Sequence, residues 1–299
     1  MTDYGHTLSF GLSLDPDVNR LDETRLLATA AEDGGLDYLA VQDHAYQPGH
    51  LDAWTLITHL ATRTRRVSFL TDVADLQLRP PAMLAKAAAS LGVLAGGRTV
   101  LGVGGGAFAD AIAGMGGGRR GGGEMVAYTE ESLHVMRAAL SGGGVRLRSD
   151  QHTIEGYAAG PVPPAPIPLW LGAQGPKMLA VTGRAADGWV SPLNIYVPPA
   201  EVPGKQKTID EAARAAGRDP AGIRRIYNVI GVIGDVRGGP GLAGDARRWA
   251  DTLTEWAVEL GFDTFVFWPV AEHRVQLDVF AAEVVPAVRE QVARTRGQR

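Results

Sequence analysis

The feature that most constrains the fold is a repeated order of strand then helix along the chain. Short apolar runs with no polar face alternate with longer segments of helical periodicity. Strands that are buried on both faces indicate a parallel sheet, and eight such units in succession indicate a closed barrel. The sequence therefore predicts an α/β fold, a (β/α)8 TIM barrel, with residues 1–299 as one domain. The expected strands are 8–14, 38–41, 67–73, 99–103, 168–172, 188–191, 225–233 and 264–268.

Two segments do not fit the repeat and are predicted to be insertions, 104–123 after the fourth strand and 142–166 before the fifth. Glycine is 39 of 299 residues, and thirteen glycines fall between Gly96 and Gly123. Such a stretch has few apolar anchors and a freely rotating backbone. We expect residues 104–123 to be a mobile lid that closes when substrate binds, and 142–166 to contain a hairpin.

Charge and composition exclude several classes of protein. The net charge of −4 gives no basic field for nucleic acid or an anionic membrane. No apolar run approaches the 18–20 or so residues that span a bilayer, and the first residues do not resemble a secretion signal. Cysteine is absent, and His44 and His50 are the only close histidines, so no metal site is expected. These features predict a cytoplasmic protein.

The ends of the predicted strands carry the candidate chemistry, because active sites of such barrels lie at the carboxyl ends of the strands. Asp43 and His44 follow the second strand, and Trp268 ends the eighth. Most other strand ends are apolar or glycine-rich, which suits a large planar cofactor that supplies the chemistry itself. Gln174, Gly175 and Pro176 open a helix whose free N–H groups could hold a phosphate, although an ordinary strand-to-helix turn would look the same.

Three segments resemble the bacterial luciferase-like superfamily of flavin- and deazaflavin-dependent oxidoreductases. They are LAVQDH at 39–44, RPPAMLAKAAASLGVLAGGRTVLGVGGG at 79–106, and PIPLWLGAQGPKMLAVTGRAADGWVS at 166–191. The second and third are specific for the superfamily and do not separate its members. The resemblance implies a barrel that binds a reduced isoalloxazine-type ring at the C-terminal ends of its strands, often as a homodimer.

The resemblance also implies roles for particular residues. Ala173, Gln174 and Gly175, with Pro176, match the loop that holds the cofactor phosphate, and Gly104, Gly105 and Gly106 match a loop along the cofactor. Asp72 and Val73 match a strand-three bulge that often carries a non-proline cis peptide behind the ring. Asp43 and His44 match a catalytic Asp–His pair near the ring. Ala107 stands where the sugar-phosphate dehydrogenases of the group place an acidic residue, so that substrate is not expected.

The sequence leaves three functions open. The first is a monooxygenase that uses reduced FMN and dioxygen to oxidise a small organic substrate, with a flavin reductase as the supplier of reduced FMN. The second is an oxidoreductase that transfers hydride with the deazaflavin coenzyme F420. The third is a flavin-binding barrel without catalysis. In the first two, His44 is expected to move a proton and Trp268 to line the substrate space.

Overall fold

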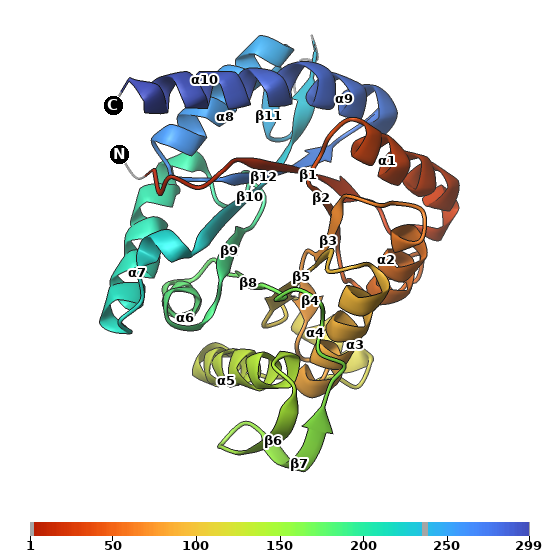
Figure 1. The fold of residues 1–299 in the computed structure, drawn as a ribbon, viewed down its shortest axis with the longest axis vertical. Coiled ribbons are helices and arrows are strands. Elements are labelled where there is room, and N and C mark those ends of the chain that lie inside the picture. Colours follow the sequence, from red (N-terminus) through yellow and green to blue (C-terminus); the bar gives the residue numbers. More distant parts are fainter. Residues whose placement is uncertain (1–2, 235–238, 299) are drawn as a thin grey trace.

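Eight parallel strands form the centre of the molecule in the computed structural model, which describes residues 3–234 and 239–298 (Figure 1). Each pairs in parallel with its neighbours, and β9 pairs with β10, which closes the ring. This arrangement confirms the predicted (β/α)8 barrel. The barrel strands are β1 Ser9–Leu14, β2 Tyr38–Val41, β3 Ser68–Thr71, β5 Thr99–Gly104, β8 Leu169–Gly172, β9 Gly188–Ser191, β10 Arg224–Ile233 and β12 Thr264–Pro269. Two short strands extend it: β4 Ala74–Asp75 pairs with β5, and β11 Leu242–Gly244 pairs with β10.

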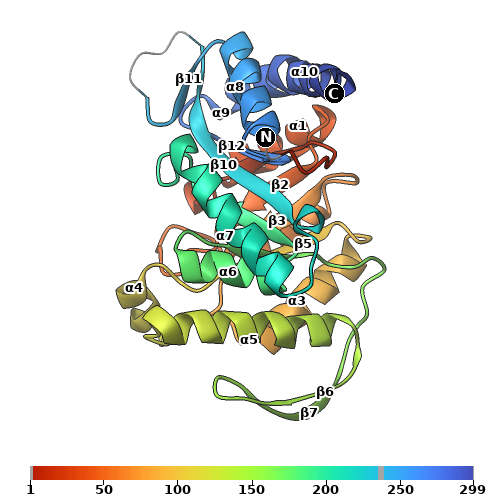
Figure 2. The ribbon, with the colours of Figure 1, turned by 90° about the vertical axis from the view of Figure 1, so that its left-hand side faces the viewer.

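Helices surround the strands, as Figures 1 and 2 show. A glycine or proline marks the ends of several of them: α1 stops at Gly34, and α6 begins after Gly175. The last helical segment contains five residues of π-helix, 280–284. The helices are α1 Leu21–Asp33, α2 Ala53–Ala61, α3 Pro81–Leu94, α4 Ala109–Gly114, α5 Gly122–Leu140, α6 Pro176–Ala185, α7 Val202–Ala215, α8 Ala246–Val258, α9 His273–Val279 and α10 Val285–Gly297.

The first insertion is better anchored than the sequence predicts. It contains α4, and the side chain of Ile112 in that helix is fully buried. Gly122 and Gly123 belong to the first turn of α5 rather than to a loop. Ile112 is the one buried apolar side chain among residues 104–123, which agrees with the expectation of few apolar anchors. Close approaches at Gly106 and Gly117 add contacts that the sequence does not predict, and closure of this segment over a substrate stays a prediction. In Figure 2, α4 lies to the left, at the carboxyl ends of the strands.

The second insertion is the predicted hairpin. Its strands are β6 Gly143–Arg148 and β7 Thr153–Ala159, which pair antiparallel as a separate two-stranded sheet. The hairpin lies along α5 (Figure 2), where the ring of His152 packs on Tyr128 with the centroids 4.6 Å apart. This insertion therefore covers a helix on the outside of the barrel.

Apolar side chains fill the inside of the barrel. The inward cluster comprises Ala40, Leu70, Val100, Trp170, Val190, Ile226 and Val266, all buried. The strand residues between them point outward to a larger core beneath the helices. Because side chains alternate along a strand, the residues two positions further on form the next inward layer, at the carboxyl ends of the strands.

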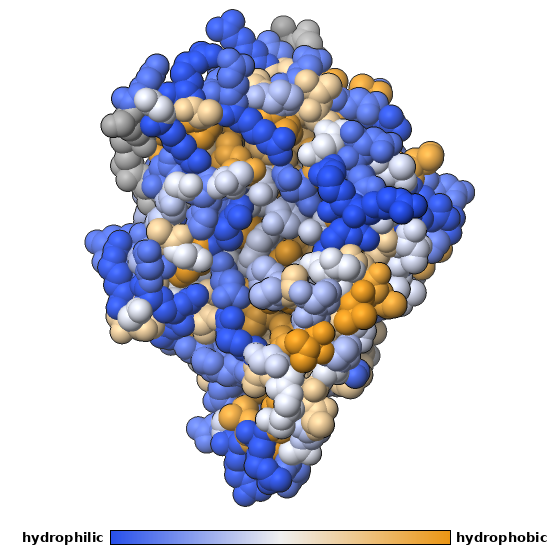
Figure 3. Space-filling view, in the orientation of Figure 1, coloured by the Kyte–Doolittle hydropathy of each residue, from blue (hydrophilic) through white to orange (hydrophobic). Residues whose placement is uncertain are grey.

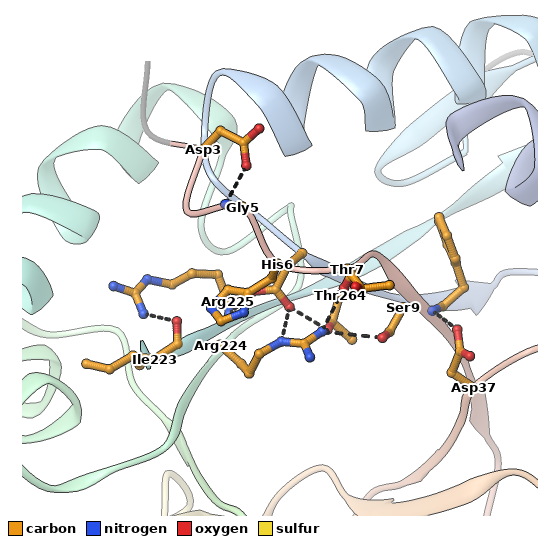
Figure 4. Close-up of polar contacts among 12 residues, drawn as sticks. Asp3, Gly5, His6, Thr7, Ser9, Asp37, Ile223, Arg224, Arg225 and Thr264 are labelled. Atoms are coloured by element: carbon orange, nitrogen blue, oxygen red, sulfur yellow. Dashed lines mark hydrogen bonds and ion pairs between the residues drawn. The ribbon is translucent and has the colours of Figure 1, made fainter. Parts of the chain in front are cut away.

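A polar network closes the other end of the barrel. Arg224 donates to Asp263 at 2.6 Å and reaches the carbonyl of Thr7 and the hydroxyl groups of Ser9 and Thr264 (Figure 4). Arg225 is fully buried and donates to Asp210 at 2.8 Å. The surface seen from this end is mostly hydrophilic (Figure 3). A network with its polar groups paired leaves the opposite end as the place for a ligand.

Candidate active site

Three side chains from well-separated strands form a hydrogen-bonded chain at the carboxyl ends of the strands. Asp72, Asn228 and Trp268 lie two positions beyond Leu70, Ile226 and Val266, so they form the next inward layer. Nδ2 of Asn228 donates to Oδ1 of Asp72 at 3.2 Å, and the indole N–H of Trp268 donates to Oδ1 of Asn228 at 2.9 Å. These hydrogen bonds join the end of β3 to β10 and β12 across the barrel interior, at the carboxyl ends of the strands.

The carboxyl group of Asp72 lies in a buried environment with few polar partners. Its side chain is buried, and Oδ2 has no hydrogen-bond partner among the described residues. Burial raises the pKa of Asp72 to about 7, and the bond from Asn228 opposes that rise. Near neutral pH the group can therefore hold or release a proton.

Val73 lies next to this chain and meets two glycines. A Cβ on Gly104 would come within 2.8 Å of the Val73 side chain, and one on Gly172 within 3.0 Å, so a side chain at either position would press on Val73. The peptide bond between Asp72 and Val73 is cis, as the resemblance suggested. The predicted ring-supporting residues thus lie together at the strand ends.

Asp43 does not pair with His44 as expected. Its carboxylate is buried and receives two hydrogen bonds from the guanidinium of Arg79, at 2.6 and 2.7 Å. Arg79 also bonds to Asp52 at 2.5 Å. A bidentate ion pair of this kind satisfies the carboxylate, so Asp43 anchors the start of α3 and does not hydrogen-bond to the imidazole next to it.

His44 lies instead in a group of aromatic rings. Its ring stacks on Tyr46, with centroids 5.5 Å apart, and meets Phe108 edge-on at 5.5 Å. His50 is parallel to it at 6.4 Å. Burial lowers the pKa of His44, the nearby His50 lowers it further, and Asp43 opposes both. The imidazole is therefore neutral at pH 7 and able to accept a proton.

The side chain of Gln77 holds the loop of Gly104, Gly105 and Gly106 in place. The side chain of Gln77 donates to the carbonyl of Gly105 at 2.7 Å and accepts from the backbone N–H of Arg120 at 2.9 Å. Gly106 has a positive φ of 91°, and a Cβ there would collide with Gln77. One glutamine thus joins both ends of the first insertion.

The start of α6 is open. A Cβ on Gly175 would meet no atom within 4 Å, although its φ of −79° suits any residue. Pro176 is the first residue of the helix, and no hydrogen bond within the described chain engages the backbone N–H of Lys177 or Met178. Next to it, Lys205 donates to the carbonyl of Gln174 at 3.2 Å. Free N–H groups and a nearby ammonium suit an anion.

Sequence reasoning missed Arg79, Gln77, Asn228 and the aromatic group around His44. Asn228 had a signal: it is a polar residue in the run IYNVIGVI, on the inward side of an apolar strand. Arg79, Gln77 and Phe108 had none, because their contacts join segments that lie far apart in the sequence. In the described ranges no three His, Asp or Glu side chains are grouped so as to hold a metal ion, and no helix there is long and apolar enough to cross a bilayer.

Comparison with known proteins decides the family. The family model described as luciferase-like monooxygenase matches residues 2–237. The chain belongs to this family. It is 36% identical over 174 residues to an F420-dependent glucose-6-phosphate dehydrogenase of Gordonia bronchialis, covering 55% of this chain and 51% of that protein. It is 34% identical over 198 residues to a 5,10-methylenetetrahydromethanopterin reductase of Methanolobus tindarius, covering 64% and 56%.

Solved structures of other proteins share the fold. An F420-dependent secondary alcohol dehydrogenase superposes with a TM-score of 0.84 at 20% identity, over 95% of this chain and 99% of that one. The coenzyme F420-dependent tetrahydromethanopterin reductase of Methanopyrus kandleri gives 0.82 at 20% identity, over 94% and 99%. The luciferase-like chain spans about half to three fifths of the length of the curated relatives it matches.

Proposed function

We propose that this luciferase-like chain is an oxidoreductase that uses coenzyme F420 to move hydride to or from a small organic substrate. The observation that carries the proposal is that the curated relatives above 30% identity include F420-dependent dehydrogenases. Use of reduced FMN and dioxygen is not named for either of the curated relatives described above. It stays the alternative that experiment must separate.

The residues at the strand ends fit a ring with a phosphate-bearing chain. The open space at Gly175 and the free N–H groups of α6 would hold the phosphate. Val73, with Gly104 and Gly172 beside it, would support one face of the ring. Glycine at 175 would let the ligand approach the backbone closely, whereas Gly104 and Gly172 make room for the Val73 side chain.

We assign to His44 the role of accepting the proton that the substrate releases. When bound, the coenzyme accepts or returns the hydride; the protein must handle the proton that a hydroxyl substrate loses in the same reaction. The neutral imidazole of His44 can accept it, while Tyr46 and Phe108 pack against its ring and would orient it. Asp43, held by Arg79, sets the backbone before His44.

The substrate is proposed to be apolar and without a phosphate. Phe108, Ile195 and Tyr196 are exposed on the segments that follow β5 and β9, and exposed apolar side chains near a site favour apolar ligands. Ala107 replaces the acidic residue that the resemblance assigns to sugar-phosphate dehydrogenases. A secondary alcohol or its ketone fits this setting better than glucose 6-phosphate.

The test is a turnover assay with both cofactor systems. Oxidised coenzyme F420 is mixed with a series of aliphatic and aromatic secondary alcohols, and with glucose 6-phosphate, and loss of the coenzyme's visible absorbance is followed. In parallel, oxygen consumption is recorded with reduced FMN and the same compounds. Reduction of the coenzyme by apolar alcohols is expected; substrate-dependent oxygen consumption with FMN alone would contradict the proposal.

A further inference from the structure

The hydrogen bonds of Asn228 fix which way its amide faces. Nδ2 donates to Oδ1 of Asp72 at 3.2 Å and to the carbonyl of Ser191 at 3.1 Å. Both partners accept hydrogen bonds in these contacts, so the amide nitrogen must face them and the amide oxygen must face away. That oxygen then receives the indole N–H of Trp268 at 2.9 Å. A flipped amide would lose all three bonds.

Trp268 is the outermost member of this chain. It packs against the inward cluster and is only partly buried, at the carboxyl end of β12. Because its N–H is hydrogen-bonded to Asn228, the planar indole is held in one orientation. An aromatic ring held in this way can form a wall of a ligand site and select ligands by their shape. Asp72 and Asn228 are themselves buried, so their effect on a ligand passes through the indole.

We propose that Asp72 and Asn228 are positioning residues that keep the Trp268 indole in one orientation, as a wall of the ligand space. The protonation state of Asp72 controls that orientation. This inference rests on the proposed function for the identity of the ligand, but not for the hydrogen-bonded chain itself.

The proton belongs on Oδ2, the carboxyl oxygen with no partner. With Oδ2 protonated, Asp72 is neutral and Oδ1 still accepts from Asn228. Loss of the proton leaves a buried charge with one hydrogen bond, which must draw in water or move its partners. Because burial brings the pKa of Asp72 to about 7, this change falls near neutral pH.

The charged groups at the neighbouring strand ends interact with partners other than Asp72. Asp43, at the end of β2, is paired with Arg79, and Asp75 on β4 interacts with both. His44 interacts with His50 and Asp43. The side chains that face Asp72 from β10 and β12, Asn228 and Trp268, do not titrate. None of the charged groups contributes to the pKa of Asp72.

The test is fluorine NMR of the ligand-free protein labelled with 5-fluorotryptophan. The chain has 6 tryptophans, and the Trp268 signal is assigned from its loss in Trp268→Phe. Between pH 5.5 and 8.5 we expect this signal to shift with a midpoint near 7. Asp72→Asn should abolish the titration while keeping an acceptor for Asn228, whereas His44→Ala should preserve it. Trp170, at the other end of the interior beside Tyr38, is the internal control and should not move.

Addition of coenzyme F420 separates the two proposals. If the ligand binds, as its own fluorescence reports, the Trp268 signal should shift while that of Trp170 stays. A Trp268 signal that ignores pH, or that titrates unchanged in Asp72→Asn, overturns the inference. Binding without any change at Trp268 overturns its role as a wall. Absence of binding refutes the F420 proposal, and the pH titration still decides on the hydrogen-bonded chain.

Discussion

At the scale of single residues, contacts rather than neighbours in sequence decide what Asp43 and His44 can do. Their adjacency in the sequence suggests one catalytic pair, but in the structure Asp43 hydrogen-bonds to Arg79 and His44 packs among aromatic rings. Among the described residues, no carboxylate hydrogen-bonds to this imidazole. Its lowered pKa keeps it neutral over a wider range of pH, which suits a proton acceptor.

His44→Ala should lower turnover about 10²–10⁴-fold with little change in cofactor affinity, since general acid–base help is worth that much. In the wild type, alcohol oxidation should fall only below the ordinary histidine pKa, as His44 becomes protonated. Steady-state rates from pH 5 to 9 measure both effects. His134→Ala, on the exposed side of α5, should behave as wild type. Wild-type turnover in the His44 variant would make this residue structural.

Gly175→Val should raise the cofactor dissociation constant at least about tenfold, equivalent to about 1.4 kcal/mol. No protein atom lies within 4 Å of a Cβ there, so the variant should fold normally and the added side chain should meet only a ligand. Fluorescence titration gives the constant. Gly144→Val, in equally open space on β6, is the matched control. Equal constants for the two folded variants would refute the phosphate site.

At the scale of elements, periodicity was enough to predict the strands, because strands that are buried on both faces leave a local pattern in the sequence. It failed in the first insertion. There Gly106 and Gly117 lie against Gln77 and Ile112, whereas a Cβ on Gly114, Gly116 or Gly121 would meet no atom within 4 Å. A close approach between distant segments leaves no local pattern, so composition alone read the segment as a free loop.

Gln77→Leu should loosen the first insertion and nothing else. The change removes the donor to Gly105 and the acceptor for Arg120, and unpaired buried backbone groups cost about 1–3 kcal/mol each. Hydrogen exchange should speed up across residues 105–121, with peptides from β1 and β12 as internal references. Unchanged exchange in that segment would show that other contacts anchor it.

At the scale of the whole molecule, the two ends of the barrel are built differently. The end near the N-terminus has buried, paired charges around Arg225, and the other has glycines, aromatic rings and the unpaired oxygen of Asp72. The sequence predicts the second end as the site, because barrels of this kind place chemistry there. It does not predict the closed end, since Arg225 and its partner Asp210 belong to different elements.

Arg225→Met should destabilise the fold by about 3–5 kcal/mol, because it leaves Asp210 without its buried partner. Urea unfolding measures the change. Arg247→Met removes an ion pair of similar type whose arginine is 89% exposed, and it should shift the unfolding free energy by no more than about 0.5 kcal/mol. Equal effects from the two variants would mean that the buried pair does not stabilise this end.

The proposed function depends on which ring the barrel binds. The most direct measurement is an equilibrium titration of the purified wild-type chain with coenzyme F420 and, separately under anaerobic conditions, with reduced FMN, followed by fluorescence. Tighter binding of coenzyme F420, weakened at least about tenfold by Gly175→Val, is the predicted result. Tighter binding of reduced FMN, or coenzyme F420 binding that is indifferent to Gly175→Val, would contradict it.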